Sequence, residues 1–164
     1  MALIKSISGI RGTIGGKTND NLTPLDVVKF AAAYGTWLMQ QSDNHTVVIG
    51  RDGRISGEMV SSLVVNTLLG LGLNVVDLGR STTPTVEMAV QFENAAGGII
   101  LTASHNPKEW NALKLLNSKG EFISGDEGKL ILDLAAAEDF NFAAVDKLGT
   151  CTKDDSSLQK HIDA

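Results

Sequence analysis

At 164 residues, the chain is long enough for one ordinary domain with its own hydrophobic core. Hydrophobic residues make up 43% of it and charged residues 20%, which favours a folded chain over a disordered one. The net charge of −5 gives no basic footprint for nucleic acid, and no apolar run is long enough to span a bilayer. We therefore expect a globular protein with no nucleic-acid partner and no membrane segment.

The cellular compartment follows from the N-terminus and from cysteine usage. The first twelve residues lack the apolar stretch of a signal peptide, and the single cysteine, Cys151, cannot form an internal disulfide. Both features fit a reducing cytoplasm, so we expect a cytoplasmic protein. Cys151 lies in a polar stretch without an obvious base nearby, and we expect it to take no part in chemistry.

Helical periodicity and strand-like apolar runs alternate along the chain. Thr23 and Pro24 are typical of a helix N-terminus, and Ser124 begins a capping-box pattern. Ser56 is expected to cap another helix, which Gly72 is suited to end. The predicted helices are 24–41, 57–71, 83–92 and 125–137, and the predicted strands are 46–50, 74–78, 97–102 and 113–116.

This alternation predicts the fold class. The strands show no clean alternation of apolar and polar residues, and helices separate them, which is typical of a sheet buried on both faces. We predict an α/β fold with three layers, α/β/α, around a mixed, mostly parallel sheet. Residues 113–116 follow the preceding strand so closely that they are expected to add an antiparallel edge strand. Beyond residue 138 the periodicity is lost, as in a tail or a linker.

Three loops directly follow predicted strands, and such loops form the binding crevice of a doubly wound sheet. The loop 50–57 carries Arg51 and Arg54 between glycines, before a helix N-terminus, which favours an anion. The alternative is an arginine–aspartate pair that only organises the turn. In the loop 79–84 the hydroxyl groups are expected to cap the following helix.

The third loop, 102–107, places Ser104 after the most apolar strand. Asn106 and Pro107 favour a turn and restrict the backbone, so Ser104 would present its hydroxyl in one place. The neighbouring His105 is weak evidence for a serine hydrolase, because triad residues come from distant parts of a sequence and the Gly-x-Ser-x-Gly elbow is absent. The alternative is a polar turn that only satisfies its own backbone.

An arginine near the N-terminus could join these loops. Arg11 lies between glycines and apolar residues in the segment 8–13, where we favour an anion contact over a structural salt bridge. Together the loops carry more cations than acids in an otherwise acidic protein. A phosphate group needs such cations, so composition points to a phosphorylated ligand. The cations are Arg11, Arg51, Arg54, Lys108 and Lys114.

Three segments resemble motifs of the α-D-phosphohexomutases, a family of phosphoglucomutases, phosphomannomutases and phosphoglucosamine mutases. Residues 102–107 with 110–114 resemble the family's active-site segment. Residues 8–12 resemble its N-terminal Gly-Ile-Arg-Gly element, and residues 50–56 its Gly-Arg-Asp-x-Arg-x-Ser element. All three occur in the family's order.

The resemblance implies an enzyme of the isomerase class that moves phosphate between the 1- and 6-hydroxyls of a hexose. The intermediate would be a hexose 1,6-bisphosphate, which is also the expected activator. Ser104 would be the phosphoserine and would ligate Mg²⁺ through its phosphate. Lys114 would be the general acid and base, helped by His105 and Arg11. The implied phosphate-binding residues are Arg11, Arg51, Asn106 and Lys114.

The resemblance also implies a domain organisation. It covers residues 1–145, which correspond to the family's first domain, and 146–164 would connect to a missing second domain. In the family, the metal-binding Asp-Gly-Asp-x-Asp loop and the sugar-selecting loops belong to domains 2–4. The expected partners are therefore those domains and a phosphosugar, and this chain alone is expected to be inactive. The alternative is a stand-alone, non-enzymatic α/β module that binds a phosphorylated ligand.

Overall fold

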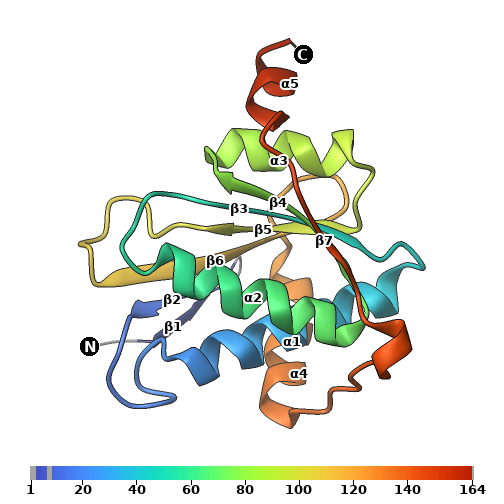
Figure 1. Cartoon of the computed structure of the whole chain (residues 1–164). Helices are drawn as coiled ribbons and strands as arrows, with labels where there is room; N and C mark the ends of the chain where they lie inside the picture. Colours follow the sequence, from blue (N-terminus) through green and yellow to red (C-terminus); the bar gives the residue numbers. More distant parts are fainter. Residues whose placement is uncertain (1–2, 7–8, 164) are drawn as a thin grey trace.

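A seven-stranded mixed sheet runs through the part of the chain that the computed structural model describes (Figure 1). That part is residues 3–6 and 9–163, without the side chains of 157, 158 and 161, so Ser8 of the N-terminal motif lies outside it. The strand order is β1-β2-β6-β5-β3-β4-β7. The strands are β1 (Leu3–Ser6), β2 (Gly9–Thr13), β3 (Thr46–Arg51), β4 (Asn74–Arg80), β5 (Gly97–Leu101), β6 (Trp110–Leu116) and β7 (Cys151–Lys153).

Helices cover both faces of this sheet, which confirms the predicted three-layer α/β/α fold. The middle strands β5, β3 and β4 are parallel, whereas β6 is antiparallel to β5. The helices are α1 (Pro24–Gln41), α2 (Gly57–Leu71), α3 (Thr83–Phe92), α4 (Gly125–Ala137) and α5 (Ser157–Asp163), with a short 3₁₀ turn at Val145–Lys147. In the described residues, none of the helices combines the length and apolarity needed to cross a membrane.

Strand β3 shows how the sequence fills two cores at once. Val47 and Ile49 point to the face covered by α1, α2 and α4, whereas Val48 points to the face covered by α3. Successive side chains of a strand alternate between faces, so a continuous run of β-branched residues buries both sides. The helices therefore lie on both sides of the strand ends that carry the loops of interest.

The helix boundaries agree with the predicted ones, because local caps set them. Thr23 accepts a hydrogen bond from the backbone of Asp26, and the Asp26 carboxylate accepts one in return, which completes a capping box. Ser124 begins α4 in the same way, and Gly72 ends α2 with a left-handed backbone. The predicted cap at Ser56 is wrong, because that side chain makes no capping bond. It instead accepts a hydrogen bond from Asn111 of β6.

The strand at 113–116 is antiparallel to its neighbour, as predicted, but the prediction that it forms an edge is wrong. It begins at Trp110 and lies inside the sheet, since the hairpin of β1 and β2 adds two strands beyond it. Gly9 permits this pairing: a Cβ atom there would overlap the carbonyl oxygen of Leu113. Two glycines and an arginine in five residues hide the strand character of β2 in the sequence.

The segment after α4 returns to the opposite edge of the sheet. Residues 151–153 form β7, which pairs in parallel with β4. Cys151 is exposed on this strand. Partial burial and the nearby Asp77 carboxylate raise the pKa of its thiol, which lowers its reactivity.

Candidate active site at the carboxyl ends of the strands

The loop after β5 presents Ser104 at its tip. The Ser104 backbone has φ +54°, a left-handed conformation that residues with a Cβ atom seldom adopt. Its amide donates to Oγ1 of Thr102 (3.1 Å), and the amide of Asn106 donates to the carbonyl oxygen of Ala103 (3.0 Å). These bonds close a tight turn, after which Pro107 prevents helical continuation. The Ser104 side chain is consequently exposed in one defined direction.

Lys114 approaches this serine from the neighbouring strand. It lies on β6 opposite Ile100 of β5, because the two strands form an antiparallel pair. Its Nζ atom donates a 2.7 Å hydrogen bond to Oγ of Ser104. An ammonium group and a serine hydroxyl in direct contact can exchange a proton or share charge on the oxygen.

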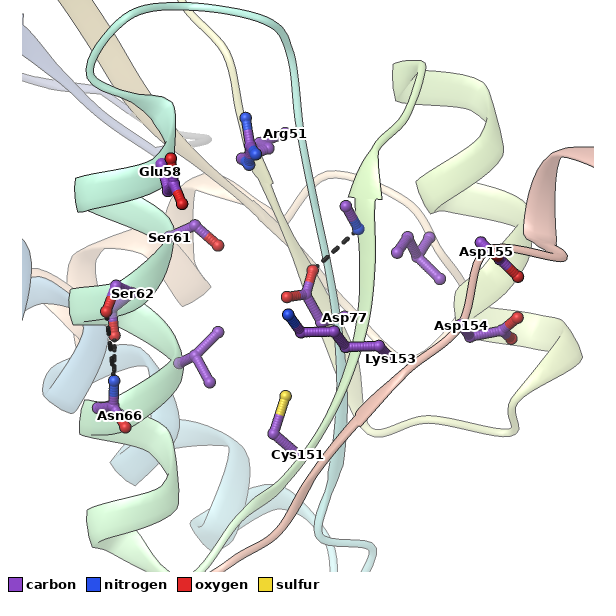
Figure 2. Close-up of a pocket in the computed structure, with 13 residues that line it drawn as sticks. Arg51, Glu58, Ser61, Ser62, Asn66, Asp77, Cys151, Lys153, Asp154 and Asp155 are labelled. Carbon is purple, nitrogen blue, oxygen red and sulfur yellow. Dashed lines mark hydrogen bonds between the residues drawn. The ribbon is translucent and has the colours of Figure 1, made fainter.

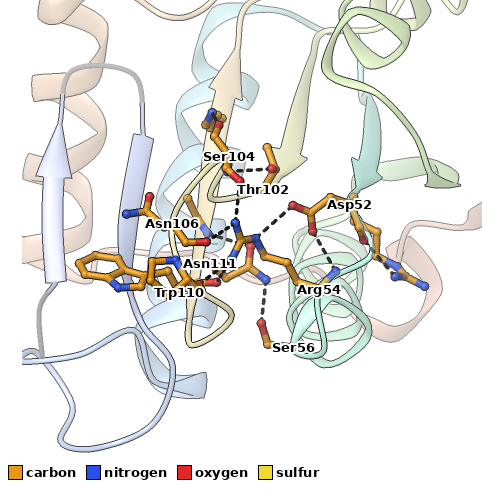
Figure 3. Close-up of polar contacts among 12 residues, drawn as sticks. Asp52, Arg54, Ser56, Thr102, Ser104, Asn106, Trp110 and Asn111 are labelled. Carbon is orange, nitrogen blue, oxygen red and sulfur yellow. Dashed lines mark hydrogen bonds and ion pairs between the residues drawn. The ribbon is translucent and has the colours of Figure 1, made fainter.

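Arg54 also holds the loop that carries Ser104 (Figure 3). Its guanidinium donates to four backbone carbonyl oxygens of residues 104–110, and it forms a 3.1 Å ion pair with Asp52. Asp52 also accepts a hydrogen bond from the Arg54 amide, so the pair organises the turn. The structure therefore shows Arg54 in the arginine–aspartate pair that organises the turn, which was the alternative to anion binding.

Arg11 lies on the same face of the sheet as Lys114. It pairs with Ala112 in the β2–β6 ladder, and side chains two residues apart on a strand point to one face. Its guanidinium carbon lies 5.8 Å from the centre of the Trp110 ring, a cation–π geometry. The Arg11 residue remains exposed, so its charge is available to a ligand beside Lys114.

His105 and Asn106 complete the tip of the loop. His105 is exposed next to Ser104, and Asn106 is half-buried with its backbone held between Ala103 and Arg54. In the described part of the chain, neither the His105 imidazole nor the side-chain amide of Asn106 makes a hydrogen bond. Both side chains can therefore turn toward a ligand of Ser104.

Comparison with known proteins identifies the family that has this arrangement. Residues 3–142 match the family described as phosphoglucomutase/phosphomannomutase, alpha/beta/alpha domain I. The chain belongs to the α-D-phosphohexomutase family, as its N-terminal domain. A phosphoglucomutase/phosphomannomutase from Thermococcus kodakarensis is 37% identical over 156 residues, which cover 93% of this chain and 34% of that protein. A phosphoglucosamine/phosphogalactosamine mutase from Sulfurisphaera tokodaii is 35% identical over 86% of this chain and 30% of that protein.

Solved structures agree with this assignment. The crystal structure of a phosphoglucomutase/phosphomannomutase family protein from Burkholderia thailandensis superposes with a TM-score of 0.79 at 25% identity. The match covers 96% of this chain and 34% of that one. This phosphohexomutase domain thus spans about a third of the length of the relatives it matches.

Arg51 of the phosphohexomutase domain faces a separate cleft, of about 660 Å³ (Figure 2). The cleft lies between α2, β4 and β7, and its lining includes neither Ser104 nor Lys114. Arg51 shares it with Glu58 and Asp77, and its Nη1 atom donates a long 3.4 Å hydrogen bond to the Asp52 carbonyl oxygen. The structure therefore does not bring Arg51 together with the serine and lysine.

Sequence reasoning gave no role to Asn111 and did not predict that Arg54 contacts the Ser104 loop. Asn111 is fully buried and donates a 2.9 Å hydrogen bond from Nδ2 to Oγ of Ser56, so it ties β6 to the loop before α2. For Arg54 the sequence predicts an anion ligand or a turn-forming pair. The Gly-Arg-Asp-x-Arg-x-Ser motif is the signal for Arg54, which contacts the serine loop, and for Ser56, which accepts the hydrogen bond from Asn111.

Proposed function

We propose that this chain is the phosphoserine-bearing domain of a phosphohexomutase that interconverts hexose 1-phosphate and hexose 6-phosphate through hexose 1,6-bisphosphate. The observation that carries the proposal is the 2.7 Å hydrogen bond between Nζ of Lys114 and Oγ of Ser104. Family membership supports it, since the relatives are named as mutases of phosphoglucose, phosphomannose and phosphoglucosamine. Because the chain spans about a third of those relatives, the activity is proposed for a longer parent protein.

The proposed reaction uses the serine as a carrier. The bond between phosphorus and Oγ of Ser104 breaks while a sugar hydroxyl oxygen forms a new bond to the same phosphorus. The proton of the sugar hydroxyl passes to solvent water, and the Lys114 ammonium protonates Oγ as the phosphoryl group leaves. In the return step the neutral Lys114 amine takes the Ser104 proton, the phosphoryl group moves from the other sugar oxygen to Oγ, and that sugar oxygen takes up a proton from solvent water. Phosphoryl transfer depends mainly on such positioning and charge neutralisation.

Nearby side chains suit the charge on the transferring group. Arg11 is proposed to bind phosphate from the face it shares with Lys114, and Asn106 from the tip of the loop. His105 is proposed to assist proton handling, since its ring is exposed next to Ser104. Arg51 is proposed as a phosphate-binding residue because of its charge and its position at the end of β3, although it points into the neighbouring cleft.

Mg²⁺ is the proposed metal. A phosphate on Ser104 would project into solvent and offer the hard oxygen ligands that Mg²⁺ prefers. Within residues 3–6 and 9–163, no group of three or more His, Cys, Asp or Glu side chains could hold a metal ion. We propose that domains 2–4 of the parent supply the remaining ligands and the sugar-binding loops. A cytoplasmic location and the inactivity of this chain alone belong to the same proposal.

Intact-mass measurement tests the phosphoserine. The chain and its Ser104→Ala variant are incubated with glucose 1,6-bisphosphate and MgCl₂, alone and within the parent protein. A phosphate adduct that maps to Ser104 and is absent from the variant supports the proposal. Binding of the bisphosphate without an adduct in either form favours the stand-alone binding module. A coupled assay of the parent on glucose, mannose and glucosamine 1-phosphates then identifies the preferred hexose.

A further inference from the structure

We infer that Arg54 is a positioning residue that holds the Ser104 loop in its reactive conformation and binds no phosphate itself. The consequence of this role for catalysis rests on the proposed function, whereas the effect of Arg54 on the loop does not. The inference concerns a side chain that touches neither Oγ of Ser104 nor Nζ of Lys114. It acts only through the backbone that carries the serine.

The hydrogen bonds of Arg54 use every donor that its side chain has. Nε donates to the Asp52 carboxylate at 3.1 Å. Nη1 donates to the carbonyl oxygens of Pro107 (2.7 Å) and Trp110 (3.1 Å), and Nη2 to those of Ser104 (2.8 Å) and Asn106 (2.9 Å). A guanidinium has five N–H donors, so none remains for a substrate phosphate.

The loop needs such a support. Ser104 adopts a left-handed backbone that is unfavourable for a residue with a Cβ atom, and such conformations persist only where the surroundings hold them. The carbonyl oxygens of residues 104, 106, 107 and 110 converge on one point, where their dipoles would repel one another without a cation. Arg54 supplies that cation, and its side chain is only 11% exposed.

Arg54 is itself fixed, so it acts as a rigid template. Asp52 binds both its Nε atom and its amide, and the Asp52 amide donates to the Leu101 carbonyl oxygen at the end of β5. Asn111 holds Ser56 at the other end of this short loop. The loop 52–56 is thus attached to β5, which leads into the Ser104 loop, and to β6, which carries Lys114.

Lysine cannot replace this arginine. A lysine ammonium keeps the charge, but it has three donors on one atom and cannot span four carbonyl oxygens in a plane. The Arg54→Lys variant therefore removes the geometry and keeps the charge. Arg80→Lys is the matched control, because Arg80 is an exposed arginine next to Gly53 of the same loop. In the described residues, Arg80 makes no hydrogen bond to the serine loop.

Amide hydrogen exchange in this 164-residue chain tests the loop directly. The Arg54→Lys variant should speed exchange at the amides of Ser104, Asn106 and Trp110 by about tenfold or more, while core amides of β3 stay protected. Arg80→Lys should leave all of them unchanged. If Arg54→Lys fails to fold, Asp52→Asn, which removes the carboxylate charge and leaves one oxygen in place of the two that hold Arg54, should give a smaller increase at the same amides. Unchanged exchange in a folded Arg54→Lys variant overturns the inference.

Kinetics of the parent protein test the catalytic consequence. Arg54→Lys should lower kcat by about a hundredfold, as expected for a misplaced reacting group, and change KM by less than about threefold. A raised KM with an unchanged kcat would mean that Arg54 binds substrate and would overturn the inference. Faster exchange in the variant, combined with no mutase activity in the unmodified parent, would leave Arg54 as a positioning residue and reject the proposed function instead.

Discussion

Nζ of Lys114 lies 2.7 Å from Oγ of Ser104, although ten residues separate them along the chain. The antiparallel pairing of β5 with β6 folds the intervening loop back on itself, so that a strand residue meets the loop tip. An ammonium that donates to a hydroxyl oxygen stabilises negative charge on that oxygen as a phosphoryl group leaves it. The contact therefore couples the proposed carrier directly to its proposed proton source.

Without Lys114, Ser104 should still carry a phosphate group but should no longer transfer it efficiently. We expect Lys114→Ala in the parent protein to lower mutase turnover by about 10²- to 10⁴-fold, the range of general acid–base catalysis. Ser104 should still carry phosphate, detectable by intact mass. Lys119→Ala, beyond the far end of the same strand, is the control and should retain turnover. Near-normal turnover of Lys114→Ala would contradict the role of the lysine.

The left-handed backbone of Ser104 should have a measurable cost. Ser104→Ala and Ser104→Gly both delete the hydroxyl, but only glycine tolerates φ +54° without strain. We expect the glycine variant to be more stable than the alanine variant by about 1 kcal/mol. Urea unfolding of the two variants measures the difference. Equal stability would mean that the loop relaxes in the absence of the hydroxyl.

Gly9 should be intolerant of a side chain because of the strand that carries Lys114. A Cβ atom on Gly9 would overlap the carbonyl oxygen of Leu113, which is backbone and cannot turn aside. We expect Gly9→Ala to cost about 1–3 kcal/mol of the free energy of unfolding. Gly53→Ala, where the nearest atoms lie 3.9 Å away, should stay within about 0.5 kcal/mol. Thermal or urea unfolding distinguishes them, and equal costs would argue against the β2–β6 pairing.

Tyr34 should make the fold sensitive to alkaline pH. Its buried hydroxyl donates to the carbonyl oxygens of Gly98 and Leu116, and burial raises its pKa far above the ordinary value of about 10. The folded state thus favours the neutral phenol. The resulting stabilisation is complete below pH ~10 and is lost above it, by up to about 1.4 kcal/mol per pH unit.

This effect can be followed optically, since Tyr34 is the only tyrosine in the chain. Tyrosinate absorbance should rise only as the protein unfolds, and Tyr34→Phe should flatten the decline of stability above pH ~10. The same variant should lose about 1–3 kcal/mol at neutral pH, because two buried carbonyl groups lose their donor. Reversible ionisation of the folded protein near pH 10 would contradict this account.

Local signals explain which parts of the fold could be predicted from the sequence. The N-termini of α1 and α4 were predictable because capping boxes at Thr23 and Ser124 act within four residues. The hairpin of β1 and β2 was not, because its pairing partner lies about a hundred residues away and its own composition is poor in strand formers. Ser56 was misassigned since its hydroxyl serves Asn111, a contact that only tertiary structure creates.

In the candidate site, too, some features could be predicted from the sequence and others depend on tertiary contacts. The resemblance to the phosphohexomutases identified Ser104 and Lys114, and the structure places them in contact. It could not show that Arg54 binds the backbone of the Ser104 loop, because the four carbonyl groups that it contacts converge only when the loop is folded. For the same reason, the cleft that Arg51 faces has no sequence signature.

Strand β7 has a practical consequence for anyone who shortens this protein. Its three residues satisfy the outer edge of β4, and the chain reaches them only after passing residue 145. A truncation at the predicted boundary of residues 1–145 would leave the outer edge of β4 unpaired, and an unpaired edge of that kind recruits strands from other molecules. Such a fragment should form aggregates, whereas one that retains residues 146–155 should stay monodisperse in gel filtration.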